Sequence, residues 1–295
     1  MKIIEKRKYS FLFSALLIII SIFFLSAWGL KLGIDFTGGV LTEIQFKQEV
    51  SKDEVVDSVK DLGLSSLLVQ PAENHSFIVR YQSENGKINS DLEKTLEEKY
   101  PEAETLRTEF VSSLVSSELK RNAIYAIIAS IIGVTWYIAW AFRKISYPIN
   151  SWKYGLGAVL ALVHDIIITL GVFAILGHLY GVEVGIPFVA ALLTIFGYSV
   201  NDTIVIFDRI RENLLRFGAG KDFEGTINKS IRESIARSLN TSLTVIFVLL
   251  AIIFFGGATI KYFALALLIG IFFGTYSSIF VATAFVAELW KKDQK

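Results

Sequence analysis

The sequence contains no cysteine among its 295 residues. Disulfides, thiolate metal sites and thiol catalysis are therefore excluded, while the redox compartment stays undetermined. Charge is also scarce, because Asp, Glu, Lys and Arg make up 19% of the chain, against about a quarter in an ordinary soluble domain. The formal net charge is only +1, so no domain-wide basic surplus exists and a nucleic-acid partner is not expected.

Apolar sequence is abundant, since hydrophobic residues make up 53% of the chain and the mean hydropathy is +0.53. A helix that spans a membrane needs about 20 mostly apolar residues. The expected fold is an α-helical membrane protein with six transmembrane helices and one small external α+β domain. The six segments that satisfy the length are 11–30, 123–142, 154–177, 186–207, 240–257 and 262–288.

The first apolar segment follows a basic start, as a secretory signal peptide also does. Its apolar stretch is long, however, and runs into Leu32-Gly33-Ile34-Asp35 without a clear small-residue cleavage site. We therefore expect an uncleaved first helix.

The distribution of Lys and Arg predicts the orientation of the helices. The loop from Gly181 to Pro187 contains neither residue, and the loop near Gly256 contains only Lys261. Because basic residues favour the cytoplasmic side, both termini are expected there, with residues 31–121 outside. The basic residues of the inner segments are Lys2, Lys6, Arg7, Lys8, Arg143, Lys144, Lys153, Arg209, Arg211, Arg216, Lys221, Lys229, Arg232, Arg237, Lys291, Lys292 and Lys295.

The external segment has the pattern of a ferredoxin-like domain. Ser51 and Glu54 have the spacing of a capping box at the start of a helix. His75 is a lone histidine in a predicted turn, and we expect a solvated or packing role for it. The expected elements are strands at 40–47, 66–70, 76–82 and 104–111 and helices at 52–62 and 89–100, in the order βαββαβ. The expected division of the chain is 1–30 for the tail and first helix, 31–121 for the external domain, and 122–295 for a five-helix bundle with its cytoplasmic loops and tail.

Two aspartates lie within the apolar helices. Asp165 follows His164 in the third helix, and counting from Tyr154 places it about 16 Å deep, near the midplane. Asp202 follows Asn201 in the fourth helix, about 9 Å inside the apolar slab. An ionised Asp at such a depth costs a few kcal/mol, so it persists only with a partner or a functional reason.

Arg237 is the candidate partner, because the fourth helix descends to the cytoplasm and the fifth starts there. Burial favours the neutral form of a carboxyl, whereas a nearby guanidinium favours the ionised form. An arginine that approaches Asp202 and withdraws would therefore make the site take up and release a proton in turn. The alternatives are that Arg237 only anchors its helix at the headgroups, that Asp202 makes a structural hydrogen bond, and that His164 and Asp165 are a satisfied packing pair.

Four stretches together resemble the SecD/SecF family of protein-export membrane proteins, itself related to the resistance-nodulation-division transporters. Taken alone, the stretch from Gly33 to Gly39 would be a plain turn at the exit from the membrane, or a glycine pair that lets two backbone segments approach closely. The four occur in the family's order and at its spacings, and the resemblance extends over nearly the whole chain. They are Gly33-Ile34-Asp35-Phe36-Thr37-Gly38-Gly39, Val163-His164-Asp165, Gly197-Tyr198-Ser199-Val200-Asn201-Asp202-Thr203, and Arg237-Ser238-Leu239-Asn240-Thr241-Ser242 with the later Gly256-Gly257.

The resemblance implies a subunit of the bacterial protein-export machinery rather than an enzyme, in the cytoplasmic membrane and without a cofactor or metal. The implied partners are SecD, the SecYEG channel, YajC, the translocating preprotein and the lipid bilayer. Asp202 and Arg237 match residues of the family's proton pathway, and the neighbouring Asn201 is assigned to the same pathway. His164 and Asp165 match a motif with a less defined role.

Two other functions are open. The chain could be half of a small-molecule or lipid efflux transporter of the resistance-nodulation-division type, although the 31–121 segment is small for the substrate pocket of such a protein. It could instead be a structural assembly factor for a membrane complex. Sodium is an alternative to the proton, because the oxygens of Asp, Asn and Thr also suit a hard cation.

Overall fold

The structure is a computed structural model that describes residues 3–72, 74–82, 87–141, 150–217 and 222–293. Five of the basic residues that predicted the orientation lie outside these ranges: Lys2, Arg143, Lys144, Lys221 and Lys295.

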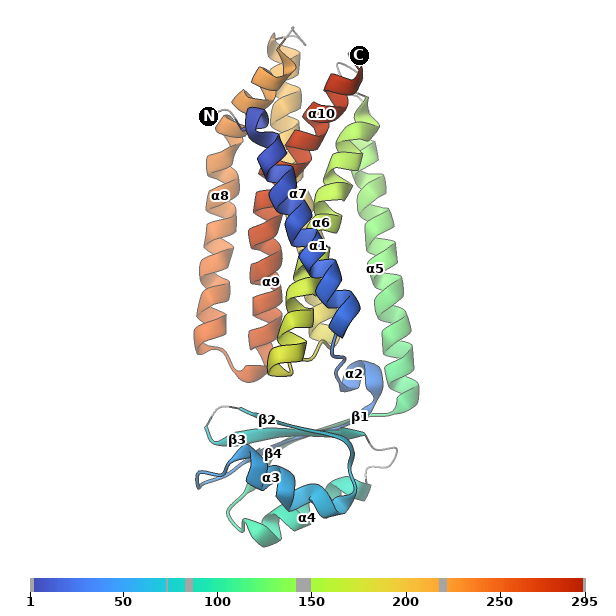
Figure 1. Ribbon diagram of the computed structural model, residues 1–295, viewed down its shortest axis with the longest axis vertical. Helices are drawn as coiled ribbons and strands as arrows, with labels where there is room; N and C mark the ends of the chain where they lie inside the picture. The colour runs from blue at the N-terminus through green and yellow to red at the C-terminus, as the bar shows by residue number, and fades with distance from the viewer. Residues whose placement is uncertain (1–2, 73, 83–86, 142–149, 218–221, 294–295) are drawn as a thin grey trace.

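Six helical spans run side by side, and a small sheet domain lies at one end of them (Figure 1). Both chain ends lie at the opposite end of the bundle. This arrangement confirms the expected fold class of six apolar helices and one small α+β domain. The spans are α1 (Arg7–Trp28), α5 (Ser113–Ala141), α6 (Ser151–Tyr180), α7 (Ile186–Phe217), α8 (Phe223–Phe255), and a last span built from α9 (Ala258–Ser277), a π-helical turn (Ser278–Ala282) and α10 (Thr283–Asp293).

Helices α7 and α8 extend well past the apolar segments that predicted them. Their extra turns are charged and pair with each other, as in Arg209 Nε to Glu233 Oε2 at 2.7 Å. Asn213 Nδ2 also donates to Glu233 Oε2 at 2.8 Å. Hydropathy detects only the part of a helix that suits lipid, so it does not place the ends of these two helices.

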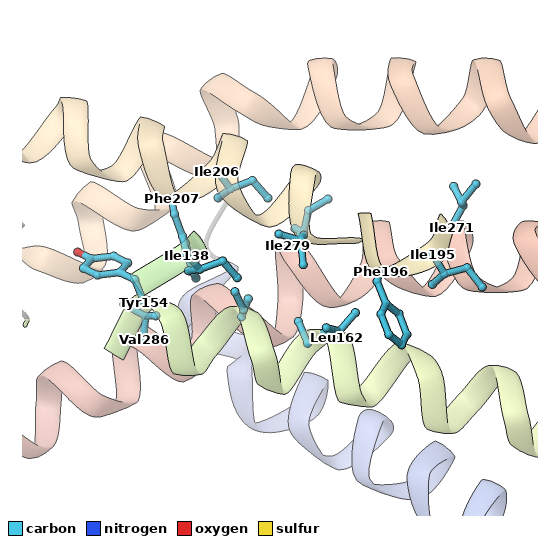
Figure 2. Packing of buried hydrophobic residues seen from close by; sticks show 14 of the residues in the cluster. Ile138, Tyr154, Leu162, Ile195, Phe196, Ile206, Phe207, Ile271, Ile279 and Val286 are labelled. Atoms are coloured by element: carbon cyan, nitrogen blue, oxygen red, sulfur yellow. The ribbon is translucent and has the colours of Figure 1, made fainter. Parts of the chain in front are cut away.

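Helices α6, α7 and the last span form the centre of the bundle. In the most apolar stretch of each central helix, at least 50% of the residues are buried. The corresponding buried share is 11% in α1, 6% in α5 and 17% in α8. Figure 2 shows Leu162, Phe207 and Ile271 among the side chains that fill the space between the central helices. The outer three helices therefore present most of their apolar surface to lipid or to another protein.

The domain that the sequence predicts to be external is a four-stranded antiparallel sheet with strand order β2-β3-β1-β4. Helices α3 and α4 cover the face that points away from the bundle (Figure 1). The predicted capping box forms, because Ser51 Oγ accepts from Glu54 N and Glu54 Oε2 accepts from Ser51 N. The order of elements is the predicted one: β1 (Gly39–Gln45), α3 (Lys52–Val59) with a 3-10 turn (Lys60–Leu62), β2 (Ser65–Pro71), β3 (Ser76–Gln82), α4 (Lys87–Lys99) and β4 (Glu104–Val111).

The glycine pair joins a short helix, α2 (Ile34–Thr37), to strand β1. Gly38 has a φ of +73° and Gly39 a φ of +129°, both unfavourable for other residues. A β-carbon on Gly39 would also lie 2.5 Å from the carbonyl oxygen of Tyr81 on the paired strand β3. The pair is therefore required where the chain leaves the membrane and enters the sheet.

We expect Gly39→Ala to destabilise the external domain by about 3 kcal/mol, since strain at a positive φ adds to a backbone clash. Hydrogen exchange of the β1 and β3 amides in the full-length protein measures the loss. Gly63→Ala is the matched control, because Gly63 has a φ of +59° but nothing within 4 Å of its would-be β-carbon. Equal exchange rates in the two variants would show that the clash at position 39 does not destabilise the domain.

Candidate functional site

The two aspartates predicted to lie within the membrane are both buried. Asp165, on α6, is 0% exposed, and the neighbouring His164 is 2% exposed. His164 Nδ1 lies 2.9 Å from Asp165 Oδ1. This contact joins two side chains that are adjacent in sequence, so the pair is set by α6 alone.

Helices α7 and α9 supply the remaining partners of Asp165. Ser199 Oγ donates to Asp165 Oδ2 at 2.6 Å, and Ser277 Oγ donates to the same oxygen at 2.8 Å. A β-carbon on Gly274 would lie 3.3 Å from Ser199 Cβ, so this glycine allows α9 to approach α7 closely. Asp165 is therefore a hub on which the three central helices converge.

A second layer of hydroxyls extends this hub. Thr203 Oγ1 and Ser278 Oγ lie 2.7 Å apart, and Ser278 Oγ also donates to the backbone oxygen of Ser199 at 3.3 Å. Ser278 begins the π-helical turn of the last span. Turns of this kind occur frequently at functional sites. Here the turn lies where Ser277 and Ser278, consecutive in the chain, both reach buried partners.

Asp202 lies three residues beyond Ser199 on α7 and is 7% exposed. The Ser238 hydroxyl of α8 lies near its carboxyl. Neither Asp202 Oδ2 nor Ser238 Oγ has a hydrogen bond to any residue that the structure describes, although both atoms are buried. A buried polar atom without a partner is costly and calls for an explanation such as a bound proton or ion.

The structure brings Arg237 near Asp202 in depth but does not pair them. Arg237 precedes Ser238 on α8 and is exposed, and within the described ranges it makes no ion pair with Asp202. Asn201 is exposed as well, on the outer side of α7. Both side chains therefore point away from this chain's own core.

The remaining motif residues lie beside or beyond the buried carboxylates, with Tyr198 one helical turn from Asp202 on α7. Gly197 is exposed and Tyr198 half-buried on α7. Gly256 and Gly257 form the turn between α8 and α9. The 33–39 stretch lies at the outer end of the bundle, where Asp35 Oδ2 accepts from Ile186 N at 2.7 Å. The motifs thus divide between a site within the bundle and a contact at its outer end.

Sequence reasoning assigned no role to Ser277, Ser278 or Ser238, although Ser238 stands in one of the four stretches that carry the family resemblance. Adjacent serines in an apolar helix were the available signal. No signal pointed to Arg80 or Glu183, which form an ion pair between the sheet and the bundle. Among the residues that the structure describes, no three His, Asp or Glu side chains gather as a metal site.

Two family models match the chain. The C-terminal model of the protein export membrane proteins SecD/SecF matches residues 91–292, and the SecD/SecF GG motif matches residues 23–50. The GG motif thus covers the glycine pair at residues 38 and 39.

The chain is also similar over its length to curated proteins. It is 43% identical to the protein translocase subunit SecF of Thermobaculum terrenum, covering 98% of this chain and 94% of the relative. It is 37% identical to the SecF subunit of Haemophilus influenzae, covering 96% of this chain and 84% of the relative.

Two solved structures have the same fold. The crystal structure of SecDF from Thermus thermophilus, described as a translocon-associated membrane protein, superposes with a TM-score of 0.87 at 32% identity over 99% of this chain. A crystal structure of SecDF in a super-membrane-facing form gives a TM-score of 0.71 at 31% identity over 100% of this chain. In both comparisons this chain spans 39% of the SecDF chain.

Proposed function

Because this chain belongs to the SecD/SecF family of protein-export membrane proteins, we propose that it uses the proton-motive force, together with SecD, to promote late translocation of polypeptides through SecYEG. It is a transport component rather than an enzyme. The observation that carries the proton-coupled part is the buried Asp202 oxygen with no hydrogen-bond partner among the described residues, close to the hydroxyl-lined Asp165.

In the proposed cycle Asp202 alternates between two protonation states. A neutral carboxyl avoids most of the cost of a charge in the membrane, and an ionised one needs a cation beside it. Arg237 is suited to this role, because it adjoins Ser238, the residue of α8 that lies near Asp202. Approach of the guanidinium would release the proton, and its withdrawal would favour uptake of the next.

The Asp165 hub supports the proposal by linking this event to helix packing. Ser199 and Asp202 lie on the same helix, so a change at Asp202 acts on the hydrogen bond between Ser199 and Asp165. Helices α6 and α9 share that hub. Protonation at one side chain could therefore move three central helices relative to one another.

The available energy suffices for such a movement. One charge that crosses a potential of about 100 mV releases about 2.3 kcal/mol. That amount shifts a two-state equilibrium by more than about tenfold for each proton.

The exposed positions of Asn201 and Arg237 support a partner in the membrane. Polar and charged side chains within a membrane usually face other helices rather than lipid. We propose that SecD supplies those helices. The further proposed partners are the SecYEG channel, the preprotein and YajC. The proposed location of the assembly is the bacterial cytoplasmic membrane. In the proposed topology both termini are cytoplasmic and the domain at 31–121 is extracytoplasmic, between a first unit at 1–30 and a bundle at 122–295.

Collapse of the proton gradient tests the function. In membrane vesicles that contain the complete Sec machinery and ATP, we expect an uncoupler to remove the stimulation of late translocation that this chain and SecD provide. The assay follows protection of a preprotein from protease after ATP-driven initiation. Stimulation that survives the uncoupler but disappears when sodium is replaced would assign the coupling to sodium, and stimulation that survives both would contradict ion coupling.

A further inference from the structure

The loop at 181–185 connects the two helices that carry the buried carboxylates. Helix α6, with Asp165, ends at Tyr180, and helix α7, with Asp202, begins at Ile186. This loop lies against the external domain at the outer end of the bundle (Figure 1). Whatever holds the loop therefore holds the outer ends of both helices.

The first attachment is made by backbone atoms. Gly33 N donates to Val184 O at 2.9 Å, and Val184 N donates to Lys31 O at 2.8 Å. These bonds form a parallel bridge between Leu32 and Val184, and Val184 is 2% exposed. The linker that leaves α1 is thus hydrogen-bonded to the loop before the chain enters the external domain.

The second attachment is made by Asp35 of the glycine motif. Its Oδ2 atom accepts from Ile186 N at 2.7 Å, an amide in the first turn of α7 that has no partner within the helix. A carboxylate is favourable there because the helix dipole is positive at this end. Gly185 leaves the space for it, since a β-carbon at that position would overlap Asp35 Oδ2.

The third and fourth attachments come from the sheet itself. Arg80, on the central strand β3, pairs with Glu183 at 2.5 Å, and the two side chains are only 20% and 10% exposed. Gln70, on β2, donates from Nε2 to Gly181 O at 2.6 Å. Burial raises the pKa of Glu183, while Arg80 and Lys31 act in the opposite direction, so the carboxylate is largely withdrawn from water.

We infer that the loop at 181–185, held by Asp35, Gln70 and Arg80, is a rigid joint that transmits displacement of α6 and α7 to the external domain. This inference rests on the proposed function. Helix α7 is continuous from the joint past Asp202, about 24 Å away along its axis. A continuous helix with a fixed end carries a shift at Asp202 to the sheet.

A charge exchange across the joint tests the inference. We expect Arg80→Glu and Glu183→Arg, each alone, to lower stimulated export about tenfold, because each leaves two like charges facing each other in a largely buried contact. The double variant restores opposite charges and should recover most of the export. Glu97→Arg, an exposed change of the same charge on α4, is the matched control.

A second measurement reports on the joint without depending on export. The chain has no cysteine, so spin labels can be placed at Glu98→Cys on α4 and Leu179→Cys on α6, both exposed. The distance distribution should be narrow in the parent, broad in each single reversal and narrow again in the double variant. If the parent's export proves insensitive to an uncoupler, the proposed function fails, yet the distances still decide whether the joint is rigid.

A disulfide between the bridged residues distinguishes a rigid joint from a latch that opens. Leu32→Cys and Val184→Cys place the two thiols on paired backbone positions. Export should persist when this bond is oxidised. Loss of export on oxidation with recovery on reduction would overturn the inference, as would full export in either single charge reversal.

Discussion

Asp202→Asn is expected to remove the proton-dependent stimulation of export, a loss of at least about tenfold, because the amide cannot take up and release a proton. Asparagine has nearly the same size and carries no charge, so the bundle should remain folded. Translocation of a preprotein into vesicles, with and without an uncoupler, measures the effect. Co-purification with SecD checks that the variant still assembles.

Asp208→Asn is the matched control for this prediction. It is the same substitution on the same helix, but Asp208 is exposed and pairs with Arg211 at 3.1 Å in the charged end of α7. Arg237→Met should reproduce the loss seen for Asp202→Asn, whereas Arg237→Lys keeps a cation and should retain part of the stimulation. Full stimulation in Asp202→Asn would remove this residue from the proposed proton pathway.

Gly171→Leu is expected to detach α1 from the bundle and to lower the stability of the protein by about 3 kcal/mol. Gly171 lies on α6, where even a β-carbon would overlap the backbone and side chain of Ser21 on α1. Ser21 is 5% exposed although most of α1 faces outward. Small residues at such a crossing allow two membrane helices to pack closely.

The thermal midpoint of the purified protein in detergent measures this destabilisation. Gly133→Leu is the control, because Gly133 lies on the exposed side of α5 and a β-carbon there meets nothing within 4 Å. An unchanged midpoint in Gly171→Leu would show that α1 does not depend on this contact.

Hydropathy and local turn signals predicted most of the elements but not all of their ends. The spans and the order of strands and helices along the chain follow from local patterns of polarity, with periods that a single segment displays. The capping box at Ser51 was predictable for the same reason. The positions where α7 ends and α8 begins were not, because their charged turns pair with each other, as Arg209 does with Glu233.

The sequence also identified the two buried carboxylates, since an Asp deep in an apolar run is conspicuous. It could not distinguish them. Only the structure shows that both oxygens of Asp165 have partners, whereas Asp202 Oδ2 has none within the described part of the chain. The difference arises from serines on α7, α8 and α9, whose positions relative to α6 are not encoded in any local spacing.

What the sequence by itself determined is therefore which segments are apolar enough to span a membrane, which small domain stands apart from them, and which charges are costly enough to need a purpose. The tertiary structure decided which of these groups meet. It alone placed Arg80 against Glu183 and Asp35 at the first turn of α7. Partition into lipid is a property of each segment, whereas a contact between distant segments depends on how all the helices pack together.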